Sequence, residues 1–153
     1  MAFLSSLNIV ASGMTAQQLR LDVVAENVTN STTTRTEAGG PYRRKMVVFQ
    51  SVAGRDDFRA AMARAAGGLA PNTGASPAGG VWVTQIVEDP SPMKLVYDPA
   101  HPDANEDGYV EMPNVDMVKE MTDAMAATQA YSANVTAFNT LKSVVAKGLE
   151  IGR

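Results

Sequence analysis

Residues 113–153, PNVDMVKEMTDAMAATQAYSANVTAFNTLKSVVAKGLEIGR, decide the fold of this chain. Alternate steps of four and three from Met117 give a row that is apolar except at Thr128 and Lys142: Met117, Met121, Ala124, Thr128, Tyr131, Val135, Phe138, Lys142, Val145 and Leu149. No proline interrupts the row, and this spacing predicts a heptad seam along one long helix. Because helices draw most of their stability from packing an apolar face, the seam requires partners.

The first thirty residues carry a matching row. Steps of three and four from Leu4 give positions that are apolar except at Gln18: Leu4, Leu7, Ala11, Met14, Gln18, Leu21, Ala25 and Val28. Phe3 and Val10 flank this row, and Val118 and Met125 flank the C-terminal row, so each stripe is wider than a two-helix seam needs. We predict that the terminal helices pair as a coiled coil and that each also packs against further neighbours.

The middle of the chain favours short strands. The run of β-branched residues after Val28 predicts that the first helix ends near Asn30. Strands are predicted over 42–52, 81–88 and 93–97, forming one small antiparallel sheet, and 98–110 is predicted to be a turn-rich loop.

The predicted fold class is therefore α+β, with three parts. Residues 1–30 form the N-terminal helix, 31–112 form the β-rich middle region, and 113–153 form the C-terminal helix, which Pro113 and Asn114 open. Within the middle region, 53–80 is predicted to be a flexible insertion between two strands, with a short helix over 56–66.

Composition excludes several classes of function. A net charge of −3 gives no electrostatic footprint for nucleic acid or for an anionic membrane. No apolar run approaches the roughly 18 residues that span a bilayer, so we predict no membrane insertion. The absence of cysteine excludes disulfides and cysteine metal sites. The first Lys or Arg is Arg20, so the N-terminus is not typical of a cleaved secretory signal.

Few residues suggest chemistry. Asp103, Asn105, Asp107 and Gly108 match the first half of a calcium-binding EF-hand loop, but its twelfth position, a bidentate Glu, is Asn114 here. A tight turn explains the same residues. His101 is the single histidine and lacks partners for a metal site or a triad. We predict no catalytic residue, cofactor or metal.

The Arg43-Arg44-Lys45 cluster at the start of the first strand suggests three readings: an anion site, a solvated strand start or an inter-subunit ion pair. An acidic chain makes the last two more natural.

The two wide stripes predict a polymer subunit. A single helical pair would leave both stripes facing water, so we expect the terminal helices to be poorly ordered in the free monomer and to become stable when many copies pack side by side. The residues predicted to pack between subunits are Leu4, Leu7, Ala11, Met14, Leu21, Ala25, Val28, Met117, Met121, Ala124, Tyr131, Val135, Phe138, Val145 and Leu149.

A family resemblance also indicates a subunit of a polymer. Residues 12–30, SGMTAQQLRLDVVAENVTN, resemble the N-terminal motif of bacterial flagellar rod and hook proteins. Further segments are similar to those of a proximal rod protein in that family: GGPYRRK at 39–45, LVYDP at 95–99, GYVEMPNVD at 108–116 and YSANVTAFN at 131–139. The insertion at 53–80 lies outside the resemblance.

The resemblance implies an axial, non-enzymatic component of the flagellar basal body. It implies export through the flagellar type III apparatus and assembly in the periplasm, between an adaptor at the export gate and the distal rod. The terminal helices would form the inner tube around the export channel, and the β region would lie outside and contact other rod subunits. Two other classes remain open from the residues alone: a secreted coiled-coil effector or adaptor, and a calcium-modulated binding module.

Overall fold

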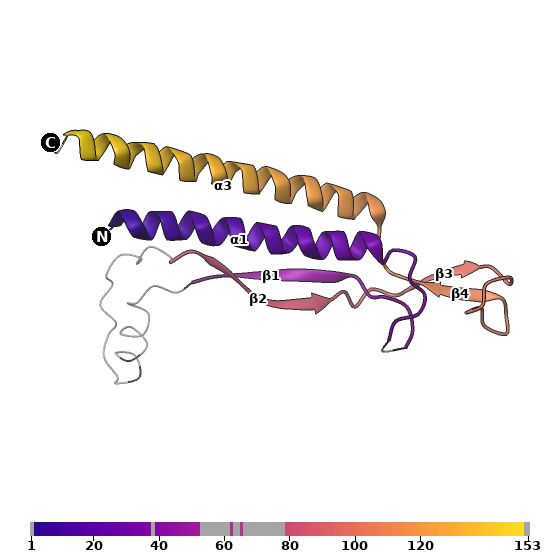
Figure 1. The fold of residues 1–153 in the computed structure, drawn as a ribbon. Helices are drawn as coiled ribbons and strands as arrows, with labels where there is room; N and C mark the ends of the chain where they lie inside the picture. The colour runs from indigo at the N-terminus through magenta and orange to yellow at the C-terminus, as the bar shows by residue number, and fades with distance from the viewer. Residues whose placement is uncertain (1, 38, 53–61, 63–64, 66–78, 152–153) are drawn as a thin grey trace. The chain divides into compact units, whose positions relative to one another are not determined.

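A computed structural model describes residues 2–37, 39–52, 62, 65 and 79–151 (Figure 1). The elements of the described part run in the order α1 (Ala2–Thr29), β1 (Lys45–Ser51), β2 (Val81–Glu88), β3 (Lys94–Tyr97), β4 (Tyr109–Met112) and α3 (Met117–Ile151). The predicted α+β class with helices at both ends is confirmed. Among the described residues, neither helix is long and apolar enough to cross a membrane.

The chain divides into two compact units, and both helices contribute to each. The first unit contains Met1–Ala16, Phe49–Val83 and Ser132–Arg153, and the second contains Gln17–Val48 and Thr84–Tyr131. Within each unit, segments far apart in sequence are therefore neighbours in space.

The strands form two sheets rather than the single sheet predicted. β1 pairs with β2, and β3 pairs with β4 in antiparallel register, with Lys94 opposite Met112 and Tyr97 opposite Tyr109. The loop predicted over 98–110 is also wrong at its end, because β4 begins at Tyr109. Asn105 builds the turn that precedes β4: its Oδ1 accepts hydrogen bonds from the backbone N–H groups of Asp107 and Tyr109.

The predicted helix ends differ in accuracy. The first helix ends at Thr29, next to the predicted Asn30. The second begins at Met117, later than the predicted start at Pro113, because Asp116 is its N-cap. The Asp116 Oδ1 accepts a hydrogen bond of 3.0 Å from the backbone N–H of Val118, and the Asp116 carbonyl accepts the first helical bond, from Glu120.

Three strand boundaries lie inside the predicted ones: β1 begins at Lys45 and ends at Ser51, and β3 begins at Lys94. The short helix predicted over 56–66 lies outside the described residues, apart from positions 62 and 65.

In the first unit, small residues allow close approach. A Cβ at Gly13 would lie 3.0 Å from Nδ2 of Asn134, so the glycine lets α1 and α3 meet there. The Ser12 hydroxyl accepts a hydrogen bond from the backbone N–H of Val81 at 3.0 Å, which ties α1 to the start of β2. Gly80, at φ +118°, lies against the same hydroxyl and fits only without a side chain.

In the second unit, a small apolar core surrounds two buried polar side chains. Its buried apolar residues come from both helices, from β4 and from the segments before β1 and α3: Val23, Val24, Tyr42, Val110, Val115 and Ala127. Asn27 and Glu120 are buried with them, at 1% and 0% exposure. These two groups require hydrogen-bond partners, because an unpaired buried polar group is costly.

Candidate functional site: a buried polar junction and an exposed helix surface

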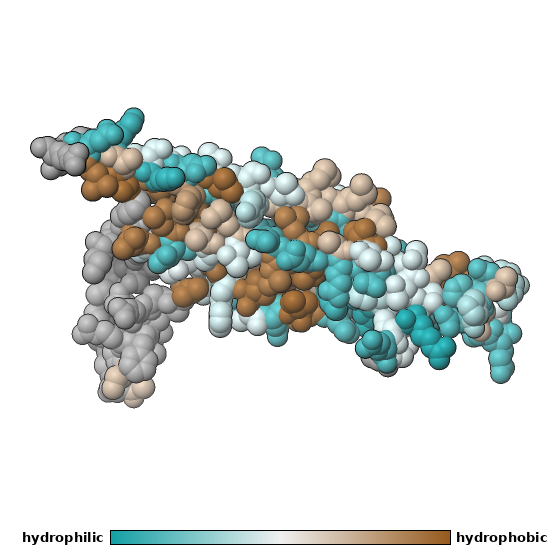
Figure 2. All heavy atoms as spheres, in the orientation of Figure 1, coloured by the Kyte–Doolittle hydropathy of each residue, from teal (hydrophilic) through white to brown (hydrophobic). Residues whose placement is uncertain are grey.

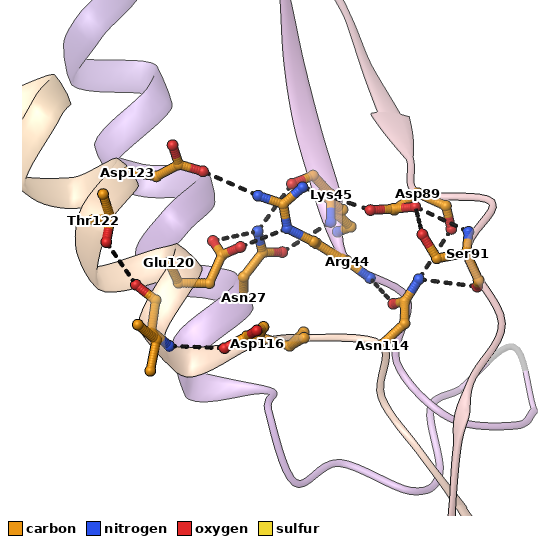
Figure 3. Close-up of polar contacts among 12 residues, drawn as sticks. Asn27, Arg44, Lys45, Asp89, Ser91, Asn114, Asp116, Glu120, Thr122 and Asp123 are labelled. Carbon is orange, nitrogen blue, oxygen red and sulfur yellow. Dashed lines mark hydrogen bonds and ion pairs between the residues drawn. The ribbon is translucent and has the colours of Figure 1, made fainter.

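The polar junction of the second unit is centred on Asn27, whose side-chain amide uses its full hydrogen-bonding capacity (Figure 3). Its Oδ1 accepts hydrogen bonds of 2.9 Å from the Tyr42 hydroxyl and from the backbone N–H of Lys45. Its Nδ2 donates to the Lys45 carbonyl at 2.9 Å and to Oε2 of Glu120 at 3.0 Å. Asn27 therefore pairs with the first residue of β1 as a neighbouring strand would, and it fixes β1 against α1.

Glu120 and Arg44 form the charged part of the junction. Arg44 Nε donates to Oε1 of Glu120 at 2.5 Å, and its Nη2 donates to Oδ2 of Asp123 at 3.0 Å. Asp123 accepts a further hydrogen bond of 3.0 Å from Arg20 of α1. A buried carboxylate is tolerated here because its charge and both of its oxygens are matched.

Asn114 connects this cluster to the ends of the strands. Its Oδ1 accepts a hydrogen bond of 2.8 Å from the backbone N–H of Arg44, and its Nδ2 donates to the carbonyls of Asp89 and Ser91. The Asp89 carboxylate lies 3.6 Å from Arg44 Nη1. The side chains of Asn114, in the segment before α3, and of Asn27, in α1, thus hold consecutive backbone groups of Arg44 and Lys45.

This packing shifts the pKa values of three side chains in the junction. Burial, together with the nearby charges of Glu26, Glu120 and Glu88, raises the pKa of the Tyr42 hydroxyl to about 12. Burial acts to lower the pKa of Arg44, but its hydrogen bond to Glu120 and the charges of Glu120, Asp123 and Asp89 raise it overall. The hydrogen bonds from the Ser91 side chain and backbone lower the pKa of Asp89, and Arg44 assists.

The contacts of the Arg43-Arg44-Lys45 cluster show how two of its three charges are used. Arg44 and Lys45 make ion pairs within the same chain, with Glu120 and Asp123 for Arg44 and with Glu26 for Lys45. The charges of these two residues are therefore matched within the chain. Arg43 is exposed.

Asp103, the first residue of the calcium hypothesis, is engaged elsewhere. Asp103 accepts a hydrogen bond from Thr34 at 2.8 Å and lies 3.7 Å from Arg35. The Nδ1 of His101 accepts a hydrogen bond from the backbone N–H of Asp103. In the described part of the chain, no group of three or more His, Asp or Glu side chains is arranged to hold a metal ion.

The predicted packing residues are not brought into a common core. Exposed positions are Leu4, Ala25, Met117, Met121 and Leu149. Half-buried positions are Leu7, Ala11, Met14, Leu21, Val28, Ala124, Tyr131, Val135, Phe138 and Val145. On α1 and α3, the fully buried positions are others: Ala16, Val23, Val24, Asn27, Glu120 and Ala127.

The start of α3 carries the clearest exposed apolar surface, in the second unit. This methionine stripe consists of Met117, Val118, Met121 and Met125, each between 42% and 73% exposed. Figure 2 shows apolar side chains reaching the surface over the helices and over the β1–β2 sheet. Burial of large apolar side chains stabilises proteins, so such a surface indicates a packing partner.

Comparisons with known proteins agree with this picture. A family described as "Flagella basal body rod protein" matches residues 7–35, and one described as "Flagellar basal body rod FlgEFG protein C-terminal" matches residues 106–151. Together the two matches cover the terminal helices and define the class of protein as that of the flagellar rod.

Full-length relatives narrow the class. The chain is 47% identical to the flagellar basal-body rod protein FlgC of Bacillus subtilis over 97% of both chains. It is 42% identical to FlgC of Borreliella burgdorferi, over 99% of this chain and 98% of the relative, and 42% identical to FlgC of Escherichia coli O6:H1 over the whole of both chains. The chain belongs to the FlgC family of flagellar basal-body rod proteins. It is accordingly a structural subunit of the basal-body rod, and not an enzyme.

Proposed function

We propose that this chain polymerises through its terminal helices into the proximal rod, where it forms part of the axial drive shaft and lines the export channel. The observation that supports this proposal is the exposure of apolar residues on both helices. Leu4 is 60% exposed, Met121 60% and Leu149 71%, and none of the residues predicted to pack between subunits is fully buried. Neighbouring copies would cover these side chains and stabilise the assembly.

In this proposal the terminal helices, 1–30 and 113–153, form the inner tube domain and pair as a coiled coil. Two contacts support the pairing, one in each unit: Gly13 against Asn134, and Asn27 against Glu120. The middle region, 31–112, lies outside the tube and carries the insertion at 53–80. The termini become fully ordered only on assembly.

The proposed partners are other copies of the chain, other flagellar rod proteins, the basal-body adaptor at the export gate and the type III export apparatus. The family resemblance supports this set and a periplasm-spanning location. The residues alone left a secreted effector and a calcium module open as alternatives, and no contact in the described residues favours either.

Two substitutions test the packing role. Met14→Asp and Val135→Asp would each place a charge on a half-buried seam position, and electron microscopy of purified basal bodies should show assembly stopping before the rod. The matched controls are Thr15→Asp and Thr136→Asp, one residue along each helix at exposed polar positions. Normal rods in the Met14 and Val135 variants would count against the proposal.

A second measurement addresses the free subunit. Far-ultraviolet circular dichroism and limited proteolysis of the dilute monomer should show reduced helix content and cleavage within both termini. Protease-resistant, fully helical termini at low concentration would contradict ordering on assembly.

A further inference from the structure

The β3–β4 sheet presents an apolar face that its own unit leaves exposed. This tip face consists of Leu95, Tyr97, Tyr109 and Glu111, which share one side of the sheet because Leu95 lies opposite Glu111 and Tyr97 opposite Tyr109. The two tyrosine rings pack edge to face at 5.3 Å between centroids. Leu95 and Tyr97 are nevertheless 66% and 64% exposed. A two-stranded sheet is marginally stable in water, so this face gains from a partner.

The surroundings of the tip face are acidic. Between residues 94 and 112 the single lysine, Lys94, is outnumbered by the carboxylates of Asp98, Asp103, Glu106, Asp107 and Glu111, of which Asp103 is paired with Arg35. Glu111 is exposed and lies on the tip face itself. A partner should therefore offer apolar side chains together with an exposed cation.

The methionine stripe of α3 has this chemistry. Lys119 is exposed beside it and makes no ion pair within the described residues. The nearby carboxylates of Glu120 and Asp123 are already matched by Arg44 and Arg20. A surface hollow of about 310 Å³ adjoins the stripe, lined by Arg44, Val118, Lys119, Thr122 and Asp123.

The spacings of the two surfaces also agree. Successive side chains on one face of a strand are about 6.8 Å apart, and positions four apart on a helix are separated by about 6 Å. Tyr97 and Tyr109 can therefore lie over Met121 and Met125 while Leu95 lies over Val118, and Glu111 then lies within reach of the long Lys119 side chain. Thioether contacts with tyrosine rings and a Glu111–Lys119 ion pair would both be favourable.

The two surfaces cannot satisfy each other within one chain. The connection from β4 to α3 is fixed: Pro113 and Val115 are buried, Asn114 bonds to Asp89 and Ser91, and Lys94 Nζ donates to the Val115 carbonyl at 2.6 Å. In this arrangement both the tip face and the stripe remain exposed.

We propose that the tip face of one copy packs on the methionine stripe of a second copy. Because the contact joins two different surfaces, a joined pair of copies keeps one surface of each kind free, and the contact can extend to further copies as a ring or as an open helical chain. This inference rests on the proposed function, in which copies of the chain assemble, and it names one contact that guides them.

The absence of cysteine permits a direct test by disulfide cross-linking. Full-length Leu95→Cys and Val118→Cys proteins would be mixed under mild oxidation, with their folding checked by circular dichroism. Leu95→Cys should cross-link to Val118→Cys at least about tenfold faster than to Ala126→Cys, an exposed site elsewhere on α3. Val96→Cys, on the opposite face of β3, should behave like the Ala126 control.

The charge pair gives a second measurement. Glu111→Lys and Lys119→Glu, added separately to the Leu95 and Val118 cysteine proteins, should slow cross-linking, and the two exchanges together should restore it. Equal cross-linking rates of Leu95→Cys with Val118→Cys and with Ala126→Cys would overturn the proposal, and so would a failure of the double exchange to restore the rate. Preferential cross-linking to a different protein in basal bodies would also overturn it. Cells that build rods and swim while the cross-link stays at control level would refute this contact alone and leave the proposed function standing.

Discussion

Asn27 of α1 and Glu120 of α3 are 93 residues apart in sequence and are joined by a hydrogen bond of 3.0 Å, with both side chains fully buried. The direction of this bond is fixed, because the Asn27 Oδ1 is already occupied by Tyr42 and by the N–H of Lys45. Asn27 can therefore only donate to position 120, and position 120 must accept from both Asn27 and Arg44.

The first prediction concerns Glu120→Gln. The NH2 group of the new glutamine would face either Asn27 Nδ2 or Arg44 Nε, and both of these groups are donors. Arg44 would also lose its buried counter-charge. We expect a loss of about 3 kcal/mol in the free energy of unfolding, measured by urea denaturation. Glu111→Gln, at an exposed position, should change stability by less than about 0.5 kcal/mol. An equal effect of both substitutions would contradict the matched junction.

The second prediction concerns Asn27→Asp, which keeps the shape of the side chain. A carboxylate cannot donate to the Lys45 carbonyl or to Glu120, and it adds a second negative charge beside Glu120. We expect a loss of about 2 kcal/mol or more at neutral pH, with partial recovery in acid as one carboxyl of the pair takes up a proton. Asp22→Asn, on the exposed surface of α1, is the control. A pH-independent loss would argue against the paired carboxyl groups.

The third prediction concerns alkaline pH. Folding raises the pKa of Tyr42 from 10.0 to about 12, so the neutral hydroxyl is favoured in the folded state. This contribution to stability is complete below pH 10 and is lost as the pH rises toward 12. Tyr42→Phe should cost about 1 kcal/mol near neutrality and should flatten the decline in this window. An unchanged decline in the Phe variant would show that another group causes it.

The fourth prediction concerns Gly80 in the first unit. Its positive φ of +118° is unfavourable for other residues, and a Cβ there would meet the Ser12 hydroxyl. Gly80→Ala should destabilise by about 2 kcal/mol. Gly148 is the matched control, because it lies inside α3 with open space around it, so Gly148→Ala should stabilise by about 0.8 kcal/mol. Thermal unfolding of the assembled protein measures both, and two changes of the same sign would contradict the account.

The long helices could be predicted because their apolar periodicity extends over many turns, whereas the strand arrangement depends on short local features. Tyr109–Met112 is too short for alternation to separate a strand from the Asp- and Gly-rich segment before it. Its pairing with β3 follows from the Asn105 turn, whose side-chain geometry is not visible in a periodic pattern. The late start of α3 has a similar cause, since Asp116 and Asn114 are equally acceptable caps by residue type.

The polar junction was missed for a different reason. Asn27 and Glu120 lie next to apolar rows, and a polar residue in such a position usually faces solvent. The available signal was the spacing of Asn27 from the buried Val23 and Val24, which places the asparagine on the buried face of α1. Only the position of the Lys45 backbone shows why an amide is required there.

The contacts of Arg44 have a mechanical consequence. Its backbone N–H is held by Asn114, its carbonyl accepts from Asp89, and its guanidinium is clamped by Glu120 and Asp123 of α3. A twisting force on the start of β1 would therefore pass into α3 through short, charge-matched contacts instead of through a pliable linker. If the rod acts as the drive shaft proposed above, we expect this residue to couple torque between the strands and the helices.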